Sequence, residues 1–270
     1  GVQDSEYVEK SVINRLKIRL NGMVNVSLNG PFPFIPALTF FASGRVRNED
    51  SYLPHGYSLE RDGFGKLTYR ATSLFKISLS GQITENESQG YNHAWKYLSE
   101  NQSHSVKNTN RFGLTLAHTI SNSMFYTAQV SRVVNNIKVQ VGNKQPQDYI
   151  RGQTGGTVYF YVSGDDSQYS DDQTSTYSGK VDATYQANNY NQFKSGFELK
   201  SHRIQVHEES QPWPSGAQYK DEYVRTPIEA SGYLQDKIEY DYLIINLGLR
   251  FDYADPKARL WLYIRRFGAF

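Results

Sequence analysis

The sequence predicts an all-β protein, the wall of an antiparallel transmembrane β-barrel with about ten strands. Long segments alternate apolar and polar residues one by one, which is the period of a strand with two unlike faces. Tight turns and long polar stretches alternate between these segments, as the short periplasmic turns and long extracellular loops of such barrels do. Aromatic residues make up 14% of the 270 residues, although the mean hydropathy is only −0.62.

The first half of the chain predicts six strands. We expect them at 16–28, 37–47, 63–71, 74–84, 112–120 and 124–131. A turn over 30–36 joins the first two, because three prolines cannot sit in a central hydrogen-bonded ladder. Long polar stretches at 48–62 and 85–107 separate the hairpins. In the first strand, Lys17 and Arg19 fall on the polar face.

The second half predicts four more strands, at 177–186, 193–202, 226–239 and 243–252. Before them lies the longest irregular stretch, 135–175, which includes a short β-like run at 157–162. The faces of 226–239 cannot be assigned because its alternation is irregular. We expect short turns near Pro33, Ser73, Asn122, Asn189 and Asp241, all on the periplasmic side.

Composition excludes several classes of function. The formal net charge is +2, with 29 basic and 27 acidic residues, which gives no electrostatic case for nucleic-acid binding. Without cysteine there is no disulfide framework and no thiolate metal site. No apolar run reaches the roughly 18 residues of a transmembrane helix, but barrel strands need only about 9–11.

Aromatic residues near the ends of the predicted strands suggest interfacial girdles. They are Tyr69, Tyr126, Tyr177, Tyr185, Phe193, Phe251 and Tyr253. The alternative interpretation is that tyrosine is simply a good strand former.

Two segments carry information beyond the alternation of apolar and polar residues. They are SLNGPFPFIPALTFFASGR at 27–45 and EASGYLQDKIEYDYLIINLGLRFDYADP at 229–256. Both resemble barrel segments of TonB-dependent outer-membrane receptors, in particular the Oar-like group with a carboxypeptidase-like regulatory domain. The resemblance implies a Gram-negative outer-membrane receptor that binds a nutrient outside the cell and imports it with energy from the TonB complex. It implies as partners the outer-membrane lipid, an extracellular ligand that the sequence does not identify, and TonB through a plug domain.

The sequence also departs from that family, whose barrels have about 22 strands and a plugged lumen. We find about ten strands and no plug, so we expect 1–270 to be a single barrel segment and a fragment rather than a processed precursor. Residues 257–270 end in Phe270. That ending resembles the terminal signature of outer-membrane barrels, but we favour a truncated or non-native end.

No catalytic constellation or cofactor site is expected, because GxSxG, HExxH and phosphate-binding glycine loops are missing. His202 and His207 with Glu208 and Glu209 form a metal candidate, but a strand end leading into a polar loop favours solvated side chains. The acidic loop 164–172 contains Asp165, Asp166, Asp171 and Asp172. It lacks EF-hand spacing, so we expect an exposed loop rather than a calcium site.

Charged residues of both signs are expected to face the lumen, where they contact water, a plug or the substrate; facing the lumen does not by itself make a residue a ligand. They are Lys17, Arg19, Arg45, Arg47, Lys76, Lys180, Asp182, Lys194, Glu198, Lys200 and Arg250. Two rivals to the receptor hypothesis stay open: a smaller complete porin or adhesin barrel, and a soluble all-β carbohydrate-binding protein. The ligand itself is beyond prediction, since receptors of different substrates share this kind of wall.

Overall fold

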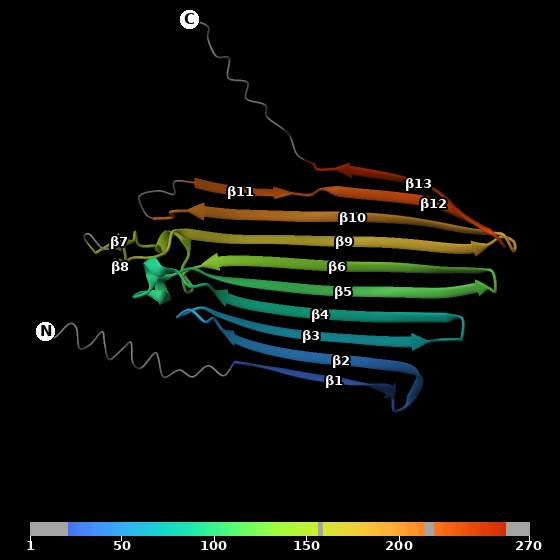
Figure 1. Cartoon of the computed structure of the whole chain (residues 1–270), viewed down its shortest axis with the longest axis horizontal. Helices are drawn as coiled ribbons and strands as arrows, with labels where there is room; N and C mark the ends of the chain where they lie inside the picture. Colours follow the sequence, from blue (N-terminus) through green and yellow to red (C-terminus); the bar gives the residue numbers. More distant parts are fainter. Residues whose placement is uncertain (1–20, 156–158, 214–218, 258–270) are drawn as a thin grey trace, which may run out of the picture.

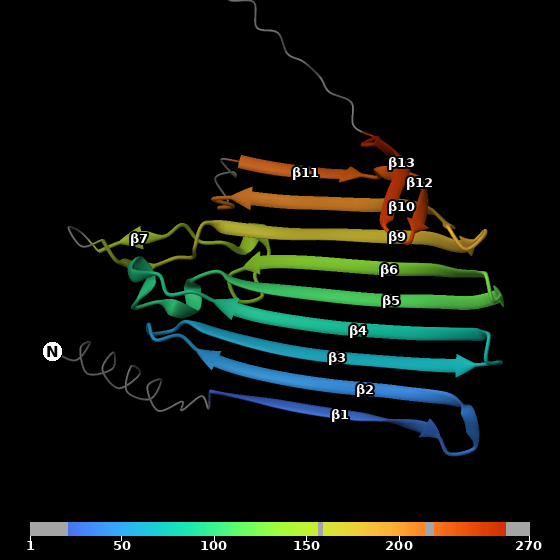
Figure 2. The same cartoon turned by 45° about the vertical axis from the view of Figure 1, so that its right-hand side comes forward.

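The structure is a computed structural model that describes residues 21–155, 159–213 and 219–257. Eleven antiparallel strands form one curved sheet, a single layer seen face-on in Figure 1 and turned in Figure 2. Its strands are β1 (Gly22–Phe32), β2 (Ile35–Asp50), β3 (Tyr57–Arg70), β4 (Phe75–Gln89), β5 (His104–Ser121), β6 (Met124–Gln140), β9 (Gln168–Gln186), β10 (Asn191–Ser210), β11 (Tyr219–Arg225), β12 (Ile228–Tyr240) and β13 (Leu243–Asp255). A separate two-stranded sheet, β7 (Gln153–Thr154) with β8 (Tyr161–Ser163), lies in the β6–β9 connection.

The strands follow one another in chain order, so every neighbour pair of the main path is antiparallel. β11 and β12 pair in turn with the same strand, β10, on either side of a break at 226–227. There the amide of His202 donates to the carbonyl of Pro227 at 2.9 Å. The alternation of the predicted 226–239 strand is irregular because Tyr233 lies on the polar face and Asp236 on the apolar face. Among the described residues, β1 and β13 form the two open edges of the path.

Short and long connections lie at opposite ends of the sheet (Figure 1). The short ones are 33–34, 71–74, 122–123, 187–190 and 241–242, where the sequence predicts them. The others, 51–56, 90–103, 141–167 and 211–218, lie at the far end and are longer. The predicted alternation of turns and loops is therefore confirmed as a geometric fact.

Several predicted boundaries are wrong, and most err in the same direction. Strands continue into stretches that were expected to be loops, since β2 reaches Asp50, β4 reaches Gln89 and β6 reaches Gln140. The start of β9 at Gln168 likewise shortens the irregular stretch 135–175. The polar residues of these stretches predict loops. A strand needs no apolar face, however, where both of its faces are in contact with water. The predicted residues 16–20, which include Lys17 and Arg19, lie outside the described part of the chain.

The proline-rich turn is also shorter than expected. Pro31 pairs with Thr39 inside the β1–β2 ladder, and only 33–34 form the turn. Proline is tolerated there because β1 is an edge strand and Pro36 stands at the start of β2.

The two faces of the sheet differ in chemistry, because directly paired residues point to the same side. Val181 pairs with Ala128 on one side and Phe197 on the other, which continues a row of apolar side chains across three strands. One residue along β9, Lys180 pairs with Gln129 and Glu198. The nine described residues of the predicted lumen set all fall on this polar face: Arg45, Arg47, Lys76, Lys180, Asp182, Lys194, Glu198, Lys200 and Arg250.

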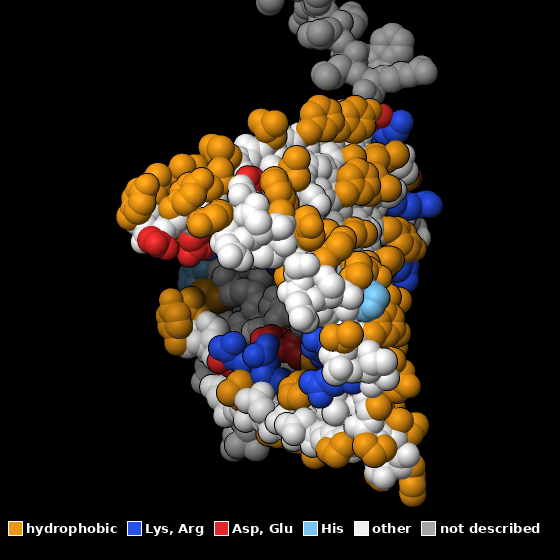
Figure 3. Space-filling model, turned by 90° about the vertical axis from the view of Figure 1, so that its right-hand side faces the viewer, with side chains coloured by type: hydrophobic (Ala, Val, Ile, Leu, Met, Phe, Trp, Pro, Cys, Tyr) orange, Lys and Arg blue, Asp and Glu red, His pale blue; other side chains and the backbone are white. Residues whose placement is uncertain are grey.

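The main sheet has no hydrophobic core of its own. The buried hydrophobic residues of the described chain are Trp95, Val141, Tyr149 and Tyr169, all at the end with the long connections. Side chains of the apolar face stay uncovered, with Val181 47% and Leu249 82% exposed. In the end-on view of Figure 3, charged side chains gather at the hollow while hydrophobic ones lie along the outer side. Contiguous exposed apolar surfaces mark sites of contact with another protein or with a membrane.

No helix among the described residues is long and apolar enough to cross a membrane.

Gly196 gives a first test of packing between strands on the polar face. A Cβ at this position would lie 2.3 Å from the ring of Tyr233 and 2.6 Å from Asp182, whereas one at Gly179 meets nothing within 4 Å. The ring of Tyr233 covers Gly196 so that its hydroxyl can donate to Asp182 at 2.9 Å. We expect Gly196→Ala to lower the free energy of unfolding by about 1–3 kcal/mol, and Gly179→Ala to leave it within about 0.5 kcal/mol. Denaturant titration of the protein in lipid measures both, and equal effects would contradict this packing.

Candidate functional site

Several charged groups of the polar face form ion pairs with one another. Near the loop end of β2 and β3, the guanidinium of Arg45 donates to Asp62 from Nε at 2.9 Å and to Glu60 at 2.6 Å. Thr84 of β4 donates to the other oxygen of Asp62 at 2.7 Å. The cluster joins three neighbouring strands, and its two carboxylates outnumber the one guanidinium.

A second charged group lies on β9, β10, β12 and β13. Lys180 contacts Asp182 at 3.0 Å, Lys200 contacts Glu198 at 3.2 Å, and Arg250 contacts Asp252 at 2.7 Å. Glu198, Lys200, Glu229, Arg250 and Asp252 help to line a shallow cavity of about 180 Å³. Here too each cation has an anion beside it.

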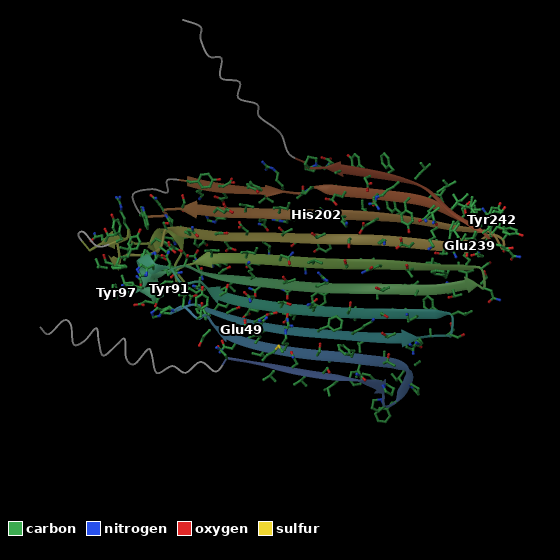
Figure 4. All side chains as sticks on the ribbon, viewed as in Figure 1. Glu49, Tyr91, Tyr97, His202, Glu239 and Tyr242 are labelled. Atoms are coloured by element: carbon green, nitrogen blue, oxygen red, sulfur yellow. The ribbon has the colours of Figure 1, made fainter. Side chains whose placement is uncertain are left out.

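The long connections 90–103 and 141–167 fold against each other, and we call their described residues the loop platform. The rings of Trp95 and Tyr161 stack at 4.1 Å. His93 and Tyr97 approach the ring of Phe160 edge-on at 5.2 and 5.5 Å, and Lys96 lies 3.9 Å above it. Figure 4 shows Tyr91 and Tyr97 at this end of the sheet, with Glu239 and Tyr242 at the opposite end. The loop platform is therefore a folded element at the end of the sheet where the long connections lie.

Asp165 is the hydrogen-bonding centre of the platform, contrary to the expectation of an exposed acidic loop. It is 1% exposed and accepts from Lys144 Nζ at 2.6 Å, from the Ile150 amide at 2.8 Å and from Asn101 Nδ2 at 3.3 Å. Asp166 accepts from the hydroxyl of Ser103 at 2.8 Å, so both carboxylates tie the two loops together. The acidic run alone predicts a solvated loop, because the lysine that pairs with Asp165, Lys144, lies outside that run.

The remaining candidates also lie elsewhere than expected. Asp171 and Asp172 belong to β9, and His202 and His207 lie within β10 rather than at a strand end. His202 accepts or donates at 2.9 Å with Thr176, and His207 does so at 2.9 Å with Glu209. The described residues contain no group of three or more His, Cys, Asp or Glu side chains placed to hold a metal.

The aromatic residues proposed as a girdle all lie on the apolar face, as their pairing shows. Tyr69, Tyr126, Tyr185 and Phe193 stand within a few residues of a short turn. Tyr177 stands near the middle of β9, with the guanidinium of Arg132 5.5 Å from its ring. An interfacial role for these residues stays a prediction.

A small core supports the platform beneath the loops. Tyr149, 1% exposed, packs with Val141, Tyr169 and Trp213. Its hydroxyl accepts from the amide of Val141 at 2.9 Å and donates to the carbonyl of Gln168 at 3.1 Å. Burial is the main reason that the pKa of Tyr149 rises to about 12.

This pKa predicts that alkali loosens the platform. The folded state keeps Tyr149 protonated up to about pH 12, whereas the unfolded loop releases the proton near pH 10. Stability from this group is therefore complete below pH 10 and falls as the pH rises through 12, by at most about 2–3 kcal/mol. Hydrogen exchange in residues 141–169 measures the opening between pH 8 and 11. We expect Tyr149→Phe to be less stable at pH 8 and to lose this pH dependence; an unchanged pH dependence would contradict the assignment.

Comparison with known proteins identifies the fold. No protein-family model matches the chain, and no curated protein matches it. The ferripyoverdine receptor of the outer membrane of Pseudomonas aeruginosa superposes with a TM-score of 0.67 at 10% identity, over 87% of this chain and 35% of the receptor.

Two further solved structures agree with it. The outer membrane transporter YddB of Escherichia coli gives a TM-score of 0.57 at 13% identity, over 86% of this chain and 34% of its own. The ferric preacinetobactin receptor BauA of Acinetobacter baumannii gives 0.59 at 10% identity, over 86% and 39%. The fold is therefore that of an antiparallel outer-membrane β-barrel wall, and this chain spans little more than a third of each of these structures. At such identities the likeness establishes the fold alone.

Proposed function

We propose that this chain is part of the barrel of a TonB-dependent receptor, which binds a nutrient outside a Gram-negative cell and imports it across the outer membrane. The observation that carries the proposal is the combination of an uncovered apolar face, a charged hollow face and folded loops at one end only. The apolar face fits lipid, the charged face fits a hydrated lumen, and the loops fit an extracellular entrance. The short-turn end is then periplasmic.

Similarity to solved receptors supports the proposal without defining the ligand. One of these proteins is a receptor for ferripyoverdine and another a receptor for ferric preacinetobactin, and a further similar structure is a peptide transporter. The resemblance of 27–45 and 229–256 to the Oar-like group is an additional reason for the receptor assignment. We propose no catalytic role, because the neighbours are receptors and transporters and the charged groups of the polar face form no reacting constellation.

The rivals are weaker on specific grounds. A soluble carbohydrate-binding protein would have to cover its apolar face, yet the described sheet is a single layer with no core between layers. A smaller porin or adhesin barrel shares the wall and differs only in lacking a plug and a TonB contact.

The gene sequence upstream of Gly1 and a pull-down with TonB together distinguish a receptor from a smaller barrel. We expect the reading frame upstream of Gly1 to encode a plug domain with a TonB-contacting segment. We also expect the full-length protein, solubilised from the outer membrane, to be retained by the periplasmic domain of TonB. A signal peptide directly before Gly1, or full-length protein that passes the TonB column unretained, would overturn the proposal in favour of the smaller barrel.

A further inference from the structure

The charged face of the sheet is electrically uneven. On the polar face of β9 to β13, Lys180, Lys200, Lys237 and Arg250 pair with adjacent carboxylates, whereas Lys194 and Arg225 have no ion pair with a described residue. Arg45 and Arg47 at the loop end of β2 are paired as well. On β3, β4 and β5 the polar face carries five exposed cations: Lys66, Arg70, Lys76, Lys107 and Arg111. None of the five has an ion pair or a side-chain hydrogen bond to another described residue.

These five side chains form what we call the cation ladder, because they follow the strands from the turn end to the loop end. Arg70 pairs with Lys76 beside a short turn, Lys66 lies four residues further along β3, and Arg111 and Lys107 continue toward the loop end of β5. At about 3.4 Å per residue, successive steps along the strand direction are roughly 7–14 Å. Arg70 and Lys76 are direct neighbours across the β3–β4 ladder, and the other cations follow at a spacing that leaves an anion beside one of them within reach of the next.

The residues between the cations leave the ladder open. Ser80 of β4 pairs with Lys66 of β3 and with Gly113 of β5, and its hydroxyl turns to the Gly113 carbonyl at 3.4 Å. Short side chains therefore flank Lys66 on its β4 side, whereas Phe41 of β2 pairs with it on the other side. No acidic residue lies on the polar face of β4 or β5. An unpaired cation on a concave wall attracts anions more strongly than a paired one, because its field is not cancelled nearby.

From this asymmetry we propose that the ladder guides an anionic solute, bearing carboxylate or phosphate groups, along β3 to β5 from the loop platform toward the short-turn end. The proposal deepens the proposed function by naming a substrate class, and its direction of travel rests on that function. A mobile solute is favoured over an acidic protein surface because the cations run the length of the strands. The cations do not form one compact patch, which is the arrangement that an acidic protein surface would neutralise on docking.

Binding of citrate, a small tricarboxylate used here as the probe, tests the ladder in the full-length protein. The ladder variant carries Lys66→Gln, Lys76→Gln and Arg111→Gln. The matched control carries Lys180→Gln, Lys200→Gln and Arg250→Gln, which removes the same formal charge from paired cations. We expect equilibrium dialysis at low salt to show saturable citrate binding that weakens about tenfold or more in the ladder variant and about twofold or less in the control.

Three outcomes would overturn the proposal. One is the absence of saturable citrate binding to the unsubstituted protein, and another is equal weakening in both variants, which would reflect net charge alone. The third is a lower melting temperature of the ladder variant with unchanged citrate binding, which would show that the ladder holds an acidic protein surface. Citrate binding by a protein that fails to be retained by TonB would overturn the proposed function and leave the ladder standing, so the two failures are distinguishable.

Discussion

Placing an arginine on the apolar face is expected to cost more than any other single change in the sheet. Val181 lies between Ala128 and Phe197 in a row that is apolar across β6, β9 and β10. In Val181→Arg the guanidinium has to lie in hydrocarbon, or reach for the interface, and no carboxylate stands beside it in that row. We expect a loss of about 2–4 kcal/mol in the free energy of unfolding measured by denaturant titration in lipid, and depletion of the protein from the outer membrane.

The matched control places the same arginine on the polar face. Thr127 of β6 lies directly opposite Asp182 of β9, so the new guanidinium in Thr127→Arg has water around it and a carboxylate across the ladder. We expect this variant to fold within about 0.5 kcal/mol of the unsubstituted protein. Similar losses for both variants would mean that the two faces share one environment, and the assignment of lipid to the apolar face would fail.

Removing Lys144 is expected to open the loop platform. Asp165 is 1% exposed, and Lys144 is the cation that contacts it, at 2.6 Å. In Lys144→Met the buried carboxylate keeps the Ile150 amide and Asn101 but loses its counter-charge. Breaking one half of a buried pair costs about 3–5 kcal/mol. Because the lysine side chain is 36% exposed, we expect about 2–3 kcal/mol here. Hydrogen–deuterium exchange should show faster exchange in residues 93–103 and 144–167.

A double-mutant cycle separates this ion pair from general damage. Asp165→Asn removes the charge that needs Lys144, so Lys144→Met should cost far less in that background, with a coupling of about 1–3 kcal/mol. Lys257→Met is the control, since its pair with Asp255 is partly exposed and stands on β13 away from the platform. Additive effects at Lys144 and Asp165 would show that the carboxylate is held by its hydrogen bonds alone.

The sequence predicts the sheet well because few structures other than a β-sheet with one apolar face produce a two-residue period of apolar and polar residues. The turn at 241–242 and the position of Lys180 on the polar face follow from alternation alone, and both are confirmed. The sequence does not predict the ends of the strands beside the long connections, because these ends are polar on both faces. Residues 168–176 of β9 have the composition of a loop and differ from one only in having neighbours with which to pair.

The candidate site was less predictable, since it depends on contacts between residues far apart in the chain. Nothing near Asp165 in the sequence indicates that it is buried against Lys144 and Asn101, which lie 21 and 64 positions away. The stacking of Trp95 on Tyr161 is equally invisible to local patterns. Lys66 and Arg111 are not in the predicted lumen set, and Arg111 lies before the predicted strand 112–120. Their place on the polar face and their lack of an ion pair follow only from the register of β3, β4 and β5.

Scanning single nitroxide spin labels along 178–183 of β9 tests the membrane-wall assignment most directly. The chain has no cysteine, so no native thiol of this segment competes for the label. In the full-length protein in lipid bilayers, we expect oxygen to relax labels at Gly179, Val181 and Ala183 most strongly. A water-soluble nickel chelate should favour labels at Ser178, Lys180 and Asp182. Nickel reaching both sets equally, or accessibility without a two-residue period, would contradict a barrel wall with lipid on one face and water on the other.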